Sequence, residues 1–225
     1  MPSLADLTTP DLEGRGRCPL LLPLGSCEQH GPHLPLDTDA RIASALADRI
    51  GATRPHLVVA PTLPYGASGE HQGLAGTVSI GLDALELVVV EVARTLGREF
   101  TGLALLSWHG GNAAALRRAA ATIAAEGRTV LNLVPRVAGD AHAGRLETSI
   151  MLALHPESVR IDRAVAGETR PLAEIMGELR ASGVAGVSPT GVLGDPTGAS
   201  AAEGEELLGS LVADLGSQID AWEES

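Results

Sequence analysis

The sequence predicts an α/β fold of three layers, α/β/α, with a mainly parallel central sheet. Short apolar runs that suit buried strands alternate along the chain with longer stretches of helical spacing. Such alternation implies βαβ units with helices on both faces of the sheet. Polar residues follow four apolar stretches, after Leu24, Pro64, Leu106 and Val134, where the loops of a parallel sheet form ligand sites. We expect one domain spanning residues 1–225.

Four apolar runs are the candidate strands. The first is compact and ends at Gly25, which is typical of a buried strand, and another is closed by Pro61. In chain order the predicted strands are Cys18–Leu24, Leu57–Ala60, Gly102–Leu106 and Thr129–Val134.

Five segments show helical spacing. In the first, Ile42 and Leu46 fall on one face and Gly51 provides a stop. The loops are rich in small and polar residues, and we expect a long loop over Tyr65–Gly81 and a structured loop over Gly183–Ala199. The predicted helices are Thr38–Ile50, Leu82–Phe100, Asn112–Glu126, Glu147–Leu154 and Ala201–Trp222.

The composition excludes several classes of function. All 16 basic residues are Arg, which rules out a lysine Schiff base and a phosphate-loop lysine. The net charge of −12 disfavours nucleic acid and anionic membranes as partners. There is no secretory signal pattern and no apolar run as long as a membrane span, and Cys18 and Cys27 form no CxxC pair. We therefore expect a cytoplasmic protein.

The richest polar cluster lies in residues 25–39, directly after the first predicted strand. It contains Glu28, His30, His33, Asp37 and Asp39, and its glycines and prolines disfavour a regular helix. Carboxylate oxygens and imidazole nitrogens are ligands of Zn²⁺, Mn²⁺ and Fe²⁺. The alternative at this point is a polar surface loop.

Three further clusters are less specific. In Trp108–Asn112, His109 lies at a strand-to-helix turn and Asn112 can cap the next helix. Two other interpretations of this segment remain possible: a capped turn in which the histidine is incidental, and a helix N-terminus that binds an anion. In His142–Ser149, a glutamate at a helix start can simply complement the helix dipole. The fourth cluster is Tyr65–Gln72. His56 and His155 lie outside all clusters, and we interpret both as non-functional.

Taken together, the motifs LPLGSCEQHGPHLPLDTD, GEHQGLAGT, HGGN and HAGRLETS resemble the creatininase family of metal-dependent amidohydrolases. The stretches DTDARIA, YGASGEHQG and GVSPTGVLGDPTG resemble the branch of that family that matures the redox cofactor mycofactocin. The resemblance covers roughly residues 20–204. It implies a creatininase-like fold and assembly as a homo-oligomer.

The resemblance also implies a site that binds two divalent metal ions, Zn²⁺, Fe²⁺ or Mn²⁺. Glu28 and His109 would bind one ion, His30 the second, and Asp39 would bridge them. Creatininase proper has a carboxylate ligand at the position of Gly111, and we infer that Glu147 fills this gap as a ligand and catalytic residue. His142 matches the acid/base histidine of the family. We expect Trp108, His71 and Tyr65 to contact the substrate.

The implied reaction is hydrolysis of an amide bond in the modified mycofactocin precursor peptide by a metal-activated water, releasing a C-terminal Val-Tyr dipeptide. One alternative is a hydrolase of creatinine or another small cyclic amide. Another is a metal- or anion-binding module without turnover. A thiolate role for Cys27 remains open, and an arginine such as Arg41 or Arg145 is a candidate to hold a peptide carboxylate.

Overall fold

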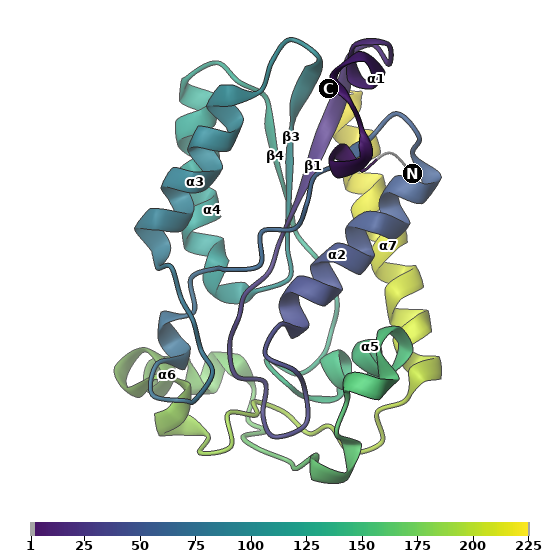
Figure 1. Ribbon diagram of the computed structural model, residues 1–225. Coiled ribbons are helices and arrows are strands. Elements are labelled where there is room, and N and C mark those ends of the chain that lie inside the picture. Colours follow the sequence, from purple (N-terminus) through teal and green to yellow (C-terminus); the bar gives the residue numbers. More distant parts are fainter. Residues whose placement is uncertain (1–2, 225) are drawn as a thin grey trace.

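A parallel sheet of four strands forms the centre of the computed structural model, which describes residues 3–224 (Figure 1). The strand order is β2-β1-β3-β4, and every neighbouring pair is parallel. Val59, Leu21, Ala104 and Leu131 lie in one row across the sheet. The predicted α/β fold is confirmed. The strands are β1 (Cys18–Leu24), β2 (Val58–Val59), β3 (Phe100–Ser107) and β4 (Val130–Leu133).

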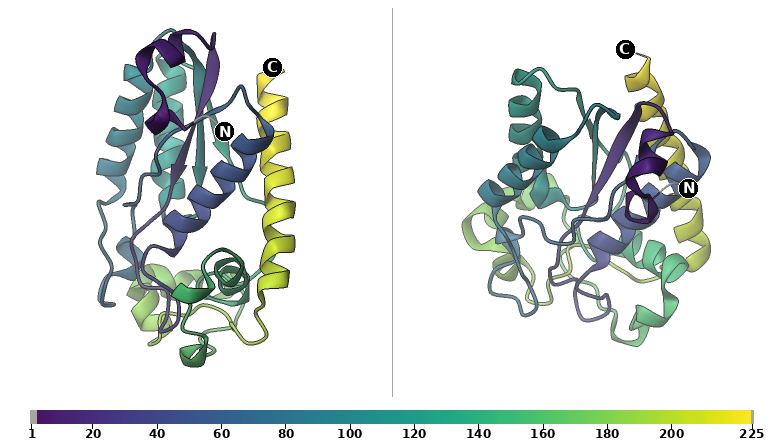
Figure 2. Two further views of the ribbon diagram at one scale, coloured as in Figure 1. Left: turned by 45° about the vertical axis from the view of Figure 1, so that its right-hand side comes forward. Right: turned by 45° about the horizontal axis from the view of Figure 1, so that its top comes forward.

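Helices cover both faces of the sheet, as Figures 1 and 2 show. On one face lie α3 (Leu82–Thr95) and α4 (Ala113–Ala125). The other face carries α2 (Thr38–Thr53) and α7 (Ala201–Glu223), and α5 (Arg145–Leu154) packs against α7. Successive strand residues point to opposite faces, so Leu20 and Leu22 join the core under α3 and α4 while Leu21 joins the core under α2 and α7.

Two helices escape the sequence prediction. The short α1 (Thr9–Glu13) precedes the sheet, and α6 (Leu172–Val187) extends into the predicted loop Gly183–Ala199. Its glycines hide the helical signal, and at Gly183 the backbone leaves helical geometry with a positive φ of 65°. The prediction of a loop was therefore wrong for residues 183–187. Short 3₁₀ turns occur at Leu4–Asp6, Gly69–His71, Gly110–Asn112, Pro156–Ser158 and Ile161–Arg163.

Boundaries of the other elements differ by a few residues. The clearest error is α3, which ends at Thr95 instead of Phe100 because Leu96 adopts an extended conformation and Phe100 already pairs in the sheet. Over residues 3–224, no helix combines the length and the apolar character needed to cross a membrane.

The carboxyl ends of all four strands point to one edge of the sheet, the lower edge in Figure 1. Helices α5 and α6 also lie at this lower end of the molecule. Loops that are far apart in sequence therefore meet at one place, which the fold class predicts as the location of a site.

Candidate metal centre

The loops at this edge bring ligand-type side chains together in a buried cluster. Glu28 and His30 follow β1, His109 follows β3, and Asp39 belongs to the first turn of α2. These side chains are between 0% and 7% exposed, which excludes the interpretation as a polar surface loop. His142, in the loop before α5, and Glu147, in its first turn, are likewise buried, at 7% and 8% exposure.

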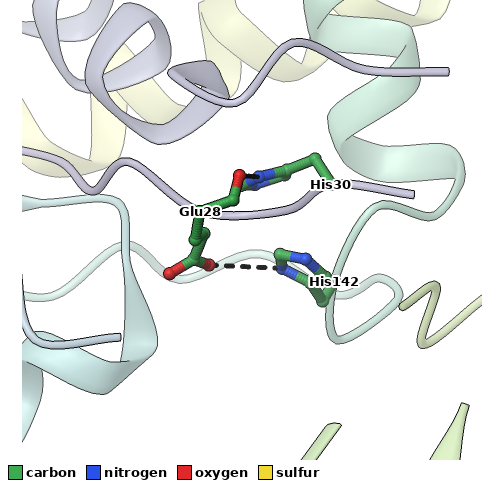
Figure 3. A group of neighbouring side chains, drawn as sticks. All are labelled: Glu28, His30 and His142. Carbon is green, nitrogen blue, oxygen red and sulfur yellow. Dashed lines mark hydrogen bonds and ion pairs between the residues drawn. The ribbon is translucent and has the colours of Figure 1, made fainter. Parts of the chain in front are cut away.

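Two groups within this cluster share Asp39. The first comprises Glu28, Asp39 and His109, and the second comprises His30, Asp39 and Glu147. A third group, shown in Figure 3, consists of Glu28, His30 and His142. Within each group one ligand-type atom per residue lies within 4.8 Å of the others. The geometry thus offers two neighbouring cation sites that have one carboxylate in common.

Each of three histidines directs one ring nitrogen to a backbone carbonyl and the other to the carboxylates. His30 Nδ1 lies 3.1 Å from the Glu28 carbonyl, while its Nε2 lies 3.2 Å from Asp39 Oδ1. His109 Nε2 lies 3.1 Å from the Ala67 carbonyl, while its Nδ1 lies 3.2 Å from Glu28 Oε1. Donation of one N–H to a carbonyl fixes the tautomer that leaves the other nitrogen free to bind a metal.

His142 follows the same pattern. Its Nε2 lies 2.7 Å from the carbonyl oxygen of Gln29, and its Nδ1 lies 3.7 Å from Glu28 Oε1. Figure 3 shows the carboxylate of Glu28 turned toward the ring of His142. Burial lowers the pKa of His142 well below the usual range, which favours the neutral form of the ring.

The carboxylates are held in place by neighbouring donors. Ser26 Oγ donates to Asp39 Oδ2 at 2.7 Å. Glu147 accepts two hydrogen bonds, from Trp108 Nε1 at 2.9 Å and from the backbone N–H of Ala143 at 2.7 Å, and its Oε2 lies 3.8 Å from His30 Nε2. Glu147 is therefore turned toward the cluster, and its role is not limited to complementing the dipole of α5.

Glu28 is different, because neither of its buried carboxylate oxygens makes a hydrogen bond of good geometry within the described residues. The closest ring nitrogens are His109 Nδ1 at 3.2 Å and His71 Nε2 at 3.3 Å from Oε1. Leaving a buried carboxylate without such partners is costly, so two orphaned oxygens point to a bound cation.

The charges of the cluster compensate one another in pairs. Burial opposes the charged form of His30, but the adjacent carboxylate of Asp39 outweighs it and raises the pKa of His30 to about 9. For His109, Asp39 and Glu28 likewise outweigh burial and raise the pKa well above the usual value. The same pairs outweigh burial on the carboxylates and lower the pKa of Asp39 and of Glu28. The carboxylates thus stabilise positive charge at both sites.

Gly111, the position for which a missing carboxylate ligand was inferred from the sequence, has no room for a side chain. A Cβ atom there would overlap Glu70 Oε1 and His109 Nε2. Glu70 Oε1 lies 3.5 Å from His109 Nε2, and burial raises the pKa of Glu70. The space on this side of His109 is therefore taken by Glu70, while Glu147 approaches His30 from α5.

A cavity of about 580 Å³ opens onto the cluster. Trp108 and His71, two of the three residues expected to contact substrate, line it; Tyr65 is 46% exposed and is not among the lining residues. His71 is also tied to the cluster, because Gln29 Nε2 donates to its Nδ1 at 2.9 Å and its Nε2 faces Glu28. The remaining lining includes Asp39, His109, His142 and Glu147.

Several expected roles are corrected by the contacts. Asn112 occupies the N-cap position of α4, but its side chain makes no capping hydrogen bond; it accepts from the Ala67 N–H and donates to the Gly25 carbonyl and Ser107 Oγ. Carboxylates next to His109 also argue against an anion-binding turn. Burial raises the pKa of the Cys27 thiol, which disfavours a thiolate.

The two arginines proposed as carboxylate binders are already paired. Arg41 donates to Asp37 Oδ1 at 2.8 Å, and Arg145 donates to Glu203 at 2.9 Å. His56 pairs with Glu223 on the surface. None of these three residues lines the cavity beside the cluster.

Sequence reasoning missed two residues that organise the site. Ser26 was passed over because a serine in a loop carries no signal of its contact with Asp39. Gln29 donates to Gly191 O and His71 Nδ1, and accepts from the Gly31 N–H through Oε1, so its amide orientation is fixed. Its position between Glu28 and His30 was the only available hint.

Several known proteins are similar to this chain in both sequence and fold. The family described as creatininase, creatinine amidohydrolase, matches residues 5–219. The mycofactocin precursor peptide peptidase of Mycobacterium ulcerans is 49% identical over 213 residues, covering 90% of this chain and 85% of that protein. Creatinine amidohydrolase of Pseudomonas putida is 30% identical over 196 residues, covering 72% and 75% of the two chains. A solved mutant creatininase of Zn-Zn type is 27% identical with a TM-score of 0.79, covering 99% of this chain and 97% of that chain.

Proposed function

The chain belongs to the creatininase family, and from this premise we propose that it is a metal-dependent peptidase that cleaves the modified mycofactocin precursor peptide. The observation that carries the proposal is the buried cluster with two cation sites that share Asp39. It is supported by 49% identity to a peptidase named for that substrate.

The residues present fit two divalent cations. Glu28, Asp39 and His109 would hold one ion, and His30, Asp39 and Glu147 the other, with Asp39 as the bridge. The orphaned oxygens of Glu28 and the carbonyl-anchored rings of His30 and His109 suit this role. Bound divalent cations supply Lewis acidity, which lowers the pKa of a water and polarises the scissile carbonyl. The donor set of oxygen and nitrogen accepts Zn²⁺, Fe²⁺ or Mn²⁺.

His142 would carry the proton during hydrolysis. Its Nε2 is anchored to the Gln29 carbonyl, and its neutral Nδ1 faces the cluster, where it can accept a proton from the attacking water. The same atom can then deliver that proton to the leaving amine. Trp108 keeps Glu147 oriented through its indole N–H, so its first role here is positioning, with a contact to substrate from the cavity wall.

The test is cleavage of the modified precursor peptide by the metal-loaded protein, followed by mass spectrometry. We expect a shortened precursor and a released fragment derived from the C-terminal Val-Tyr pair. An intact precursor after prolonged incubation, with metals bound, would contradict the proposal.

Hydrolysis of creatinine or another small cyclic amide is the second candidate, favoured by the 30% identical creatinine amidohydrolase. Ring opening of creatinine, measured in the same preparation, separates the two. A metal-binding module without turnover predicts bound ions but no product from either substrate.

A further inference from the structure

We propose that Arg117 and Arg180 form a carboxylate-binding subsite for the peptide substrate in the cavity beside the metal centre. The inference rests on the proposed function and adds the residues that recognise charge on the substrate. Arg117 belongs to α4 and Arg180 to α6, and both line the cavity of about 580 Å³ that also contains Asp39 and His109.

These two arginines carry charge that the protein itself leaves uncompensated. Within residues 3–224, neither guanidinium makes an ion pair or a hydrogen bond, whereas twelve of the sixteen arginine side chains do. Eight pair with carboxylates: Arg41, Arg49, Arg54, Arg94, Arg118, Arg136, Arg145 and Arg170. Four more donate to backbone carbonyls: Arg15, Arg17, Arg128 and Arg160.

Arg98 and Arg163 are the other two arginines without such a partner, and neither lines this cavity. Two of the four uncommitted guanidinium groups are thus found together beside the cluster. A protein of net charge −12 has many carboxylates available, so unpaired arginines in a cavity indicate a ligand of opposite charge.

The rest of the wall suits a peptide. Leu172, Met176 and Leu179 of α6 line the same cavity, together with Leu193. Apolar walls with a few placed polar groups are typical of sites that bind small organic groups. The apolar residues would contact side chains of the substrate, while the guanidinium groups bind its carboxylate.

Two carboxylates of a peptide have this chemistry. One is the C-terminal α-carboxylate, and the other is the side chain of an Asp or Glu on the opposite side of the cleaved bond. Both present a planar pair of oxygens that a guanidinium binds in bidentate fashion.

The test compares Arg117→Gln, Arg180→Gln and the double variant with Arg163→Gln, a control that removes an equally uncommitted arginine away from the cavity. For the double variant we expect KM to rise about tenfold or more, the size of a lost charge-assisted contact, with a much smaller change in kcat. Arg163→Gln should keep the KM of the wild type, and Arg117→Lys with Arg180→Lys should restore part of the loss. Raising the salt concentration should weaken the wild type more than the double variant.

Substrate variants identify the source of the carboxylate. Two altered precursors are compared with the unaltered one. The first carries a C-terminal amide, and in the second any Asp or Glu is replaced by Asn or Gln. For each substrate, KM is compared between the wild type and the double variant. If one altered substrate gives the same KM with both proteins, the carboxylate removed from that substrate is the one that the two arginines bind. If the double variant and the wild type show equal KM for every substrate, the subsite is wrong.

A binding measurement keeps this result separate from the proposed function. Fluorescence anisotropy with a labelled short peptide, bearing either its carboxylates or neutral amides, needs no turnover. A wild type that cleaves nothing would overturn the peptidase assignment. Loss of preference for the charged peptide in the double variant would still support the subsite, and an unchanged preference would overturn it.

Discussion

At the scale of single residues, the orientation of the histidine rings explains why this cluster suits metal ions. His30, His109 and His142 each direct one nitrogen to a backbone carbonyl, so their other nitrogens face the carboxylates. His71 differs, because its Nδ1 accepts from Gln29 and its Nε2 lies 3.3 Å from Glu28 Oε1. His30 and His109 have the form of ligands, His142 has the form of a proton acceptor, and His71 has the form of a residue that positions Glu28.

Substitution of the shared carboxylate tests this arrangement. We expect Asp39→Asn and Glu28→Gln to lower kcat/KM by at least about a hundredfold. Substitution of a residue that only hydrogen-bonds to a metal ligand typically lowers metal affinity or activity by roughly 10- to 100-fold, and Asp39 and Glu28 would be direct ligands. Asp37→Asn is the matched control, because Asp37 lies two residues from Asp39 but pairs with Arg41 at the surface. Full activity in Asp39→Asn, or an equal loss in Asp37→Asn, would contradict the assignment.

Trp108 gives a second test at this scale. Trp108→Phe keeps an aromatic ring in the cavity and removes only the N–H that donates to Glu147. We expect the affinity of the second metal to fall by about 10- to 100-fold, measured by competition with a chelating dye. Unchanged affinity for both metals would show that Glu147 does not depend on this hydrogen bond.

The ligand candidates could be predicted because several acids and histidines follow apolar strands, a pattern that is unusual for a solvent-exposed loop. The hydrogen-bond and ion-pair partners of the charged residues could not be predicted from the sequence. Arg41 and Arg145 look as available in the sequence as Arg117 and Arg180, yet only the folded chain places Asp37 and Glu203 beside the former pair. Which arginine is free depends on contacts between distant segments.

At the scale of elements, β1 and the helices with regular apolar spacing were predictable because burial fixes their pattern. Helix α6 was not, because Gly177, Gly183 and Gly186 lower its helical signal. Its place beside the cavity comes from tertiary contacts, which override local propensity. The omission matters, since α6 supplies Arg180 and much of the apolar wall.

The contact between α5 and α7 makes a prediction about stability. A Cβ atom at Gly204 would overlap the backbone carbonyl of Ser149, whereas one at Gly209 in the same helix would meet nothing within 4 Å. We expect Gly204→Ala to lower the free energy of unfolding by roughly 1–3 kcal/mol through overpacking. Gly209→Ala should raise it by roughly 0.5–1 kcal/mol, as alanine favours helix. Urea unfolding of the metal-free variants measures both, and equal effects would contradict the close packing.

At the scale of the whole molecule, assembly as a homo-oligomer stays a prediction. It rests on the resemblance to the family and not on the exposed apolar side chains of one chain, because single exposed residues such as Leu87 and Val134 are normal on a protein surface. We expect sedimentation velocity to show a species larger than the 23.0 kDa chain. A single monomeric species at micromolar concentration would contradict this expectation.

The charge of the molecule also acts as a whole. With a net charge of −12, the surface repels an acidic peptide, while bound cations together with Arg117 and Arg180 would provide local positive charge in the cavity. Substrate charge would therefore be selected in the cavity and not by the surface at large.

The central claim is that two cations share Asp39, and metal content measures it most directly. Purified protein, loaded with Zn²⁺, Fe²⁺ or Mn²⁺ and freed of excess ion, is analysed by inductively coupled plasma mass spectrometry. We expect two ions per chain in the wild type and one in Glu147→Gln, which keeps the group of Glu28, Asp39 and His109 intact. One ion or none in the wild type, or two in Glu147→Gln, would contradict it.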